Sequence, residues 1–139
     1  MLSISGDCED PGAYEVEYGM NNNKMLEMVG ASSVQAVQVA GPSGTCIGPD
    51  KFHQNIAFEE LPTGGAMIVI GKDRDLLKDV VMNYMDFFID ESCSSCAPCR
   101  SLSVIMKNKL EKILNGFGAN KDIDELYSWC KYMKQANRC

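Results

Sequence analysis

Hydrophobic and polar positions follow a short period in the first half of the chain. Residues 13–18 (A-Y-E-V-E-Y) alternate apolar and acidic side chains, as a half-buried strand does, and residues 34–39 (V-Q-A-V-Q-V) and 66–70 (A-M-I-V-I) form two further strand patterns. Residues 21–29 predict a short helix that begins at an asparagine cap and ends at Gly30. About four strands and one helix indicate a small β-grasp-like sheet.

A helical period replaces this pattern in the second half. Three segments, residues 73–88, 101–115 and 121–136, carry apolar side chains at spacings of three and four. The residues expected to face inward are Leu76, Leu77, Val80, Val81, Tyr84, Met85 and Phe88 in the first segment, Leu102, Ile105, Met106, Leu110, Ile113 and Leu114 in the second, and Ile123, Leu126, Tyr127, Cys130 and Met133 in the third. The connection over residues 116–120 is short, so we expect the last two helices to be antiparallel neighbours.

Turn-forming residues divide the chain at the same place. Ten of the 12 glycines and four of the five prolines lie in residues 1–71. Frequent turns followed by long stretches without helix breakers predict a β-rich module joined to a helical one. The expected fold class is therefore α+β, with a β-grasp-like domain over residues 1–71 and a helical domain over residues 72–139.

Charge and cysteine content narrow the class of protein. A formal charge of −6 and a pI near 4.7 argue against a nucleic-acid partner, which would require a basic stripe. The N-terminus lacks the pattern of a secretory signal, and no uncharged apolar run approaches the ~18 residues of a membrane span. We expect a cytoplasmic protein without direct membrane insertion. Its seven cysteines, an odd number, are then ligands or free thiols rather than a paired disulfide framework.

Three of these cysteines form the most specific motif. Cys93, Cys96 and Cys99 are separated by two residues each, between the first and second predicted helices. Thiolates at this spacing can surround one corner of a [4Fe–4S] cluster, which usually takes four cysteines. The amides at the start of the following helix favour an anionic group, and Arg100 adds a positive charge beside the third thiol.

Helix length indicates which cysteine is the fourth. The second helix carries the chain roughly 20 Å away from Cys99, and an antiparallel third helix recovers that distance only after about 14 residues. Cys139 therefore returns to the level of the three cysteines, whereas Cys130 stops about 10 Å short. Cys130 also lies on the apolar face of its helix, so we interpret it as a core residue.

Other chemistries remain open for the motif. A structural zinc site commonly uses two cysteine pairs or histidines, and the only histidine, His53, lies in the other module. Redox or nucleophilic thiol chemistry needs only one C-x-x-C pair and leaves the other thiols unexplained. Cys8 and Cys46, in the glycine-rich module, could form a redox pair, but loop thiols without a function are the favoured interpretation.

The motif and its surroundings resemble a known family. Residues 91–100 (E-S-C-S-S-C-A-P-C-R) resemble the E-S-C-G-x-C-x-P-C-R signature of the NADH-binding flavoprotein subunit of respiratory complex I, which also occurs in diaphorase subunits of NAD-reducing hydrogenases and in NAD-dependent formate dehydrogenases. Residues 5–7 (S-G-D), 11–16 (P-G-A-Y-E-V) and 37–44 (V-Q-V-A-G-P-S-G) look like the SLBB (soluble-ligand-binding β-grasp) domain that precedes this motif. The ending, residues 136–139 (A-N-R-C), looks closest to the hydrogenase diaphorase branch.

The resemblance implies a one-electron relay. In the family, NADH reduces FMN, and a [4Fe–4S] cluster on the C-terminal helical domain passes electrons singly to clusters of an iron–sulfur partner subunit. Carried over to this sequence, the cluster ligands are Cys93, Cys96, Cys99 and Cys139. The FMN- and NADH-binding domain, with its glycine-rich loop, has no counterpart here, so we do not expect the chain to be an enzyme by itself. It resembles the C-terminal part of such a subunit.

The chain departs from the family pattern inside the motif. The family usually has glycine after the first cysteine, where this sequence has Ser94. If the loop requires a positive φ at this position, serine costs on the order of 1 kcal/mol. A competing hypothesis is that the chain is a structural module that docks subunits, with zinc or no metal in place of the cluster.

Overall fold

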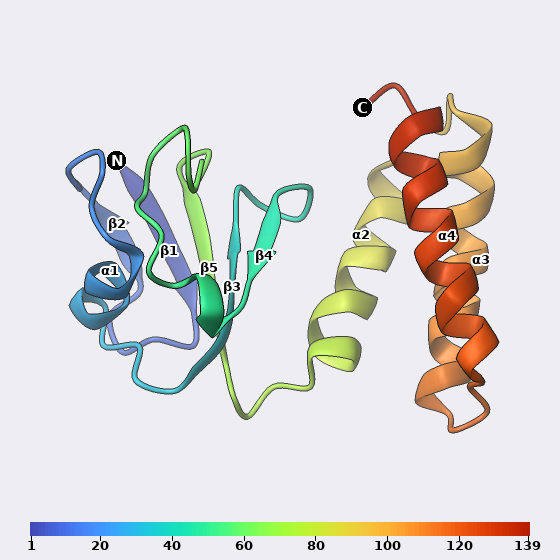
Figure 1. Ribbon diagram of the computed structural model, residues 1–139, viewed down its shortest axis with the longest axis horizontal. Coiled ribbons are helices and arrows are strands. Elements are labelled where there is room, and N and C mark those ends of the chain that lie inside the picture. The colour runs from blue at the N-terminus through green and yellow to red at the C-terminus, as the bar shows by residue number, and fades with distance from the viewer. The chain divides into compact units, whose positions relative to one another are not determined.

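The computed structural model describes all 139 residues, which form two compact units, Met1–Arg74 and Asp75–Cys139 (Figure 1). The first unit is built on a sheet and the second on helices, so the predicted α+β class is confirmed. The composition boundary, after Gly71, lies at the end of the last strand and just before Arg74. None of the helices combines the length and the apolar character that crossing a lipid bilayer requires.

The first unit contains a mixed five-stranded sheet in the order β2-β1-β5-β3-β4. Its strands are β1 (Leu2–Gly6), β2 (Gly12–Tyr14), β3 (Val34–Val39), β4 (Thr45–Ile47) and β5 (Ala66–Gly71). β1 and β5 pair in parallel, and every other neighbouring pair is antiparallel. Of the alternating segment 13–18, only the first residues form a strand, β2. The strand β4 is too short for a hydrophobic period to be recognised in its sequence.

The core of this unit is apolar and closed. α1 (Asn22–Met28) begins where the Asn21 side chain accepts the Asn23 N–H, and ends before Gly30 at φ +67°, as its sequence predicts. Its buried residues Met25 and Leu26 join one cluster with apolar side chains of the sheet and the connecting loops: Leu2, Ile4, Val29, Val37, Val39, Ile47, Phe52, Ile56, Leu61, Met67 and Val69. Removal of these apolar side chains from water stabilises the first unit.

A glycine and an aspartate close the parallel pair of strands. Gly6 has φ +97°, and a Cβ there would lie 2.1 Å from the Val69 carbonyl oxygen, so only glycine fits. The carboxylate of Asp7 accepts the Gly71 N–H at 2.9 Å and hydrogen bonds from Nε and Nη2 of Arg74 at 2.9–3.3 Å. The Arg74 contact, with the Gly71 bond, lowers the pKa of Asp7. The S-G-D segment therefore joins the end of β1 to the end of β5.

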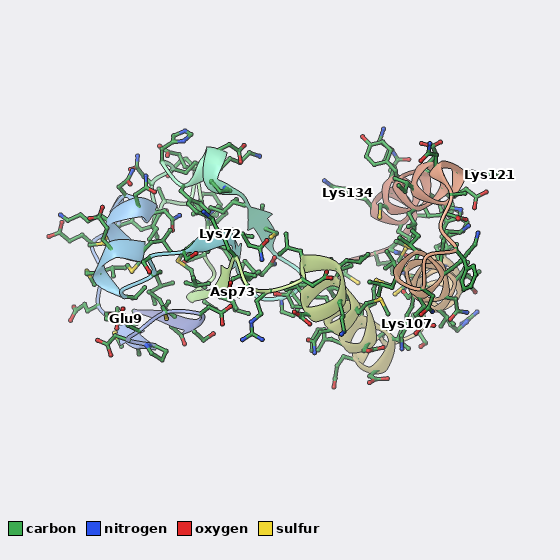
Figure 2. All side chains as sticks on the ribbon, turned by 90° about the horizontal axis from the view of Figure 1, so that it is seen from below. Glu9, Lys72, Asp73, Lys107, Lys121 and Lys134 are labelled. Carbon is green, nitrogen blue, oxygen red and sulfur yellow. The ribbon has the colours of Figure 1, made fainter.

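The second unit consists of a π-helical turn, η2 (Leu76–Val81), that continues into α2 (Met82–Glu91), followed by α3 (Ala97–Leu114) and α4 (Asn120–Ala136). The Asp75 side chain caps the first turn by accepting the N–H groups of Leu77 and Lys78. Lys107 on α3, labelled in Figure 2, pairs with Asp86 on α2. The three predicted helices are confirmed, with α3 beginning four residues earlier than expected, inside the cysteine motif.

The interior predicted for these helices is only partly covered. Only Ser103, Met106, Leu110 and Asp122 are buried in this unit, and α2 buries no residue. Exposed residues that were expected to face inward are Leu76, Val81, Ile105, Leu114, Ile123, Tyr127 and Cys130. Periodicity shows which residues share a helix face but not whether another element covers that face. For these seven residues the prediction is wrong, because the three helices cover one another's apolar faces only in part.

A buried carboxylate joins α3 to α4. The Asp122 side chain is 7% exposed and accepts hydrogen bonds from Lys109 Nζ at 2.7 Å, Lys112 Nζ at 2.7 Å and the Ala119 N–H at 2.9 Å. Lys109 also reaches Glu125 at 2.6 Å. These donors hold the pKa of Asp122 far below its usual range, first through Lys109 and then through Lys112. Because the two lysines are near the end of α3 and Asp122 is in the first turn of α4, the network fixes the antiparallel pairing.

We expect Asp122→Asn to lower the Tm of the helical unit by about 5 °C or more at pH 7, because two lysine ammonium groups lose their buried counter-charge. The Asp122 pKa is depressed on folding, so this stabilisation is complete above the unfolded value of ~3.9 and is lost as the pH falls further. The difference between wild type and variant should therefore shrink at pH 3. Thermal unfolding of the full chain, followed by circular dichroism at both pH values, measures it.

The matched control is Lys121→Gln, which removes an exposed lysine 3.6 Å from Glu125 on the same helix. An exposed pair of this kind contributes little, so the control should leave the Tm nearly unchanged. Equal losses in the two variants would show that the buried carboxylate has no special role.

Candidate metal centre

The three cysteines of the motif lie where α2 gives way to α3. Cys93 is exposed in the connection, Cys96 is the N-cap residue of α3, and Cys99 lies in its first turn, the last two being half-buried. Pro98 occupies the first turn of α3, where its missing N–H costs no helical hydrogen bond. The motif thus forms both the loop and the start of the helix.

The loop turns at Ser94, which has φ +56°. The Ser92 hydroxyl accepts the Ser94 N–H at 3.1 Å, and the Arg100 guanidinium donates to the Ser94 carbonyl at 2.9 Å. Both backbone polar groups of Ser94 are therefore bonded within the motif. The left-handed conformation explains why glycine is suited to this position, and these two bonds offset the cost of a serine there, on the order of 1 kcal/mol.

Hydroxyl groups contact two of the three thiols. Ser92 Oγ lies 3.2 Å from Cys99 Sγ, and Ser95 Oγ lies 3.4 Å from Cys93 Sγ. The contacts with Ser95 lower the pKa of the Cys93 thiol, and the positive charge of Arg138 lowers it further. The motif therefore stabilises a thiolate, which is the form that binds metal ions.

The first turn of α3 adds to this electrostatic environment. No side chain caps its N-terminal amides, since the N-cap residue is Cys96 itself. Uncapped amides and the helix dipole favour negative charge at this end. The start of α3 therefore suits an anionic group bound by thiolates.

The C-terminal end of the chain returns to the same end of the helical unit. α3 and α4 are joined in antiparallel fashion by the Asp122 network, and Figure 1 shows the start of α3 and the end of α4 at one end of this unit. Arg138 follows the end of α4, and its positive charge lowers the pKa of the Cys93 thiol. Cys139, the next residue, is exposed.

Cys130 lies six residues before the end of α4 and so about 9 Å short of that end. It is exposed, so its interpretation as a core residue is wrong: the rest of the unit covers the face that carries it only in part. Partial burial nevertheless raises the pKa of its thiol, in contrast to Cys93. Burial also raises the pKa of Cys8 and of Cys46, the two thiols of the first unit.

The sulfurs do not form a ready-made cage. No three side chains of histidine, cysteine, aspartate or glutamate converge to hold a metal ion. The donor set nevertheless fits an iron–sulfur cluster in its chemistry: four thiols, two of them hydrogen-bonded to serines, at one end of a helix pair. The assignment of Cys93, Cys96, Cys99 and Cys139 as ligands stays a prediction.

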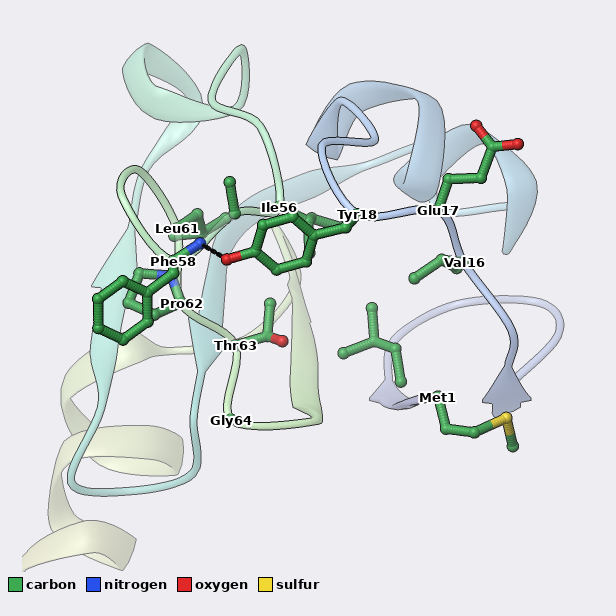
Figure 3. Close-up of a pocket in the computed structure, with 12 residues that line it drawn as sticks. Met1, Val16, Glu17, Tyr18, Ile56, Phe58, Leu61, Pro62, Thr63 and Gly64 are labelled. Carbon is green, nitrogen blue, oxygen red and sulfur yellow. Dashed lines mark hydrogen bonds between the residues drawn. The ribbon is translucent and has the colours of Figure 1, made fainter.

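The first unit carries a hollow that the sequence did not indicate. It measures about 250 Å³ and lies between the start of β1 and the loop segments 16–18 and 56–64 (Figure 3). Its wall is mainly apolar, and the Tyr18 hydroxyl accepts the Phe58 N–H across it. The residues come from three separate segments without a shared motif, so only the folded chain brings them together.

Comparison with known proteins identifies the helical region. Residues 79–139 match the family described as the NADH-ubiquinone oxidoreductase-F iron-sulfur binding region. The helical region of this chain is therefore similar to that family. The resemblance drawn from the motif is thus confirmed, and a [4Fe–4S] cluster is the cofactor of this iron–sulfur binding region.

Relatives extend the likeness to the whole chain. The NAD-reducing hydrogenase HoxS subunit alpha of Cupriavidus necator is 41% identical over 140 residues, which cover 100% of this chain and 23% of that protein. One of the NADH-quinone oxidoreductase subunits of Rhizobium meliloti is 27% identical over 94% of this chain and 34% of its own length. An NAD⁺-reducing [NiFe]-hydrogenase, solved in the H₂-reduced state, superposes with a TM-score of 0.91 at 33% identity, over 99% of this chain and 24% of that one. The chain spans about a quarter to a third of these relatives.

We expect Cys93 to react with iodoacetamide faster than Cys130 in metal-free protein at pH 7. Both thiols are exposed, but the pKa of Cys93 is lowered and that of Cys130 is raised, so Cys93 contains more of the reactive thiolate. Ser95→Ala should slow the labelling of Cys93 and leave Cys130 unaffected. Mass spectrometry of the labelled peptides over time measures both rates, and faster labelling of Cys130 would contradict the assigned electrostatics.

Proposed function

We propose that this chain is an electron-transfer module that relays single electrons through a [4Fe–4S] cluster held by Cys93, Cys96, Cys99 and Cys139. The electrons would pass between the flavin of an NAD(H)-linked oxidoreductase and the clusters of a partner subunit. The chain itself would contain no catalytic residue, because its part is to hold the cluster between donor and acceptor.

The observation that carries this proposal is the position of the cysteine motif. It lies inside a region that is similar to an iron–sulfur binding family, and it coincides with the start of α3. Helix pairing supports the fourth ligand, since the end of α4 lies at the same end of the helical unit as the motif. A redox or nucleophilic thiol site needs only one C-x-x-C pair and would leave the third and fourth cysteines unexplained.

When bound, a [4Fe–4S] cluster supplies a one-electron redox couple. The residues of the chain hold and tune the site. Arg100 and Ser92 bond the two polar groups of Ser94 and so keep the loop in its left-handed turn. The uncapped amides of α3 and the charges of Arg100 and Arg138 favour the negative charge of ligated thiolates.

The partners follow from the relatives. NAD- and NADP-reducing hydrogenases and NADH-quinone oxidoreductases contain subunits like this chain, and we propose the same setting for it, with an iron–sulfur subunit as the neighbour. The first unit, with its mixed sheet and single α-helix, would be the SLBB domain of such a protein. Seven free thiols suit a reducing compartment, which supports the cytoplasm as its location.

A second candidate function is a docking module that holds subunits together without a cluster. It is favoured by the large apolar side chains that the helical unit leaves open, among them Phe117 at 75%, Ile123 at 58% and Tyr127 at 64% exposure. Exposed apolar surface of this kind marks interaction sites. The two functions are compatible, and metal content separates them.

Iron and sulfide analysis of anaerobically purified protein tests the proposed function. We expect about four irons and four sulfides per chain, together with an EPR signal that develops on reduction. One zinc per chain, or no metal, would leave only the docking function. Reconstitution with iron and sulfide before the measurement ensures that loss during purification is not mistaken for absence.

Replacing single cysteines tests the ligand set. Cys139→Ser should reduce the iron content and the EPR signal strongly, because the cluster loses its fourth thiolate. Cys130→Ser is the matched control: it makes the same change within α4, about 9 Å from the helix end, and should leave both quantities near wild type. The reverse result would overturn the argument from helix length.

A further inference from the structure

One hydroxyl group in the motif contacts both the backbone of the turn and a ligand sulfur. Ser92 Oγ accepts the Ser94 N–H at 3.1 Å and lies 3.2 Å from Cys99 Sγ. Ser92 is half-buried at the C-cap of α2, where its backbone leaves the helix with ψ 135°. Its side chain is therefore held in place by two contacts rather than rotating freely in solvent.

The direction of the second bond follows from the chemistry of a ligating cysteine. Between a hydroxyl and a thiol, either atom can donate. A thiolate bound to iron has no proton, so it can only accept. The oxygen of Ser92 is already engaged as an acceptor for the Ser94 N–H, which leaves its own proton for the sulfur.

We propose that the Ser92 hydroxyl is a positioning residue that donates a hydrogen bond to the Cys99 sulfur and thereby raises the reduction potential of the cluster. The inference rests on the proposed function, since it requires the cluster to be bound. Reduction adds negative charge to the cluster and its sulfurs, so a fixed donor stabilises the reduced state more than the oxidised one. Removing the donor should make the cluster harder to reduce.

The geometry singles out Ser92 among the serines of the motif. Ser95 also lies near a sulfur, but it is exposed and at the longer distance of 3.4 Å. Ser103 donates to the Cys99 carbonyl at 2.6 Å and so acts on the backbone rather than on the sulfur. Ser101, which is exposed in the first turns of α3, provides a matched control because its side chain lies in solvent.

The experiment is a potentiometric titration, followed by EPR, of the full chain with its cluster bound. Ser92→Ala should shift the midpoint potential to a more negative value. Loss of a charge-assisted hydrogen bond should lower the equilibrium constant for reduction of the cluster roughly tenfold, which corresponds to about 59 mV for a one-electron couple. Ser92→Thr keeps the hydroxyl and should stay near wild type, as should Ser101→Ala.

Each outcome decides between alternatives. An unchanged or more positive potential in iron-loaded Ser92→Ala overturns the proposal, as does an equal shift in Ser101→Ala. If Ser92→Ala fails to take up iron, restoration of iron by Ser92→Thr supports a role for the shared hydroxyl, and failure of the threonine variant overturns it. Absence of iron from the wild type would instead refute the proposed function, which keeps the two failures distinct.

Discussion

The buried carboxylate of Asp122 is the interaction on which the candidate site depends. It binds two lysines near the end of α3 and the amide of Ala119, and so pairs the two long helices in antiparallel fashion. This pairing brings the end of α4 to the same end of the helical unit as the start of α3. Without it, nothing would hold the residues that follow α4 at the end of the unit that carries the motif.

The two units are stabilised in different ways, and the difference bears on function. The first has a closed apolar core, so its stability is internal. The second fully buries few residues and leaves large apolar side chains open on its helices, which ion pairs also connect. A helical unit with so little interior gains stability from whatever it binds, which fits both a bound cluster and contact with neighbouring subunits.

Within the motif, serine and arginine side chains determine the conformation of the loop that carries the cysteines. Ser94 adopts the left-handed conformation, and Ser92 and Arg100 bond its N–H and its carbonyl. The Ser92 hydroxyl also contacts the sulfur of Cys99. These contacts fix the conformation of the loop that carries the cysteines. Outer-shell groups of this kind orient metal ligands and adjust their electronic properties. In the relay proposed for this chain, they would adjust the reduction potential of the cluster.

The sequence by itself determined the α+β class, the helices, the cysteine motif and its family, because periodicity, turn residues and ligand spacing are local properties. Helix lengths also indicated that Cys139, and not Cys130, returns to the motif. Only the tertiary structure decided that Ile123, Tyr127 and Cys130 are exposed, since burial depends on which element covers a helix face. It likewise decided the roles of Asp122 and Ser92, whose partners are chosen by chain folding and not by sequence spacing alone.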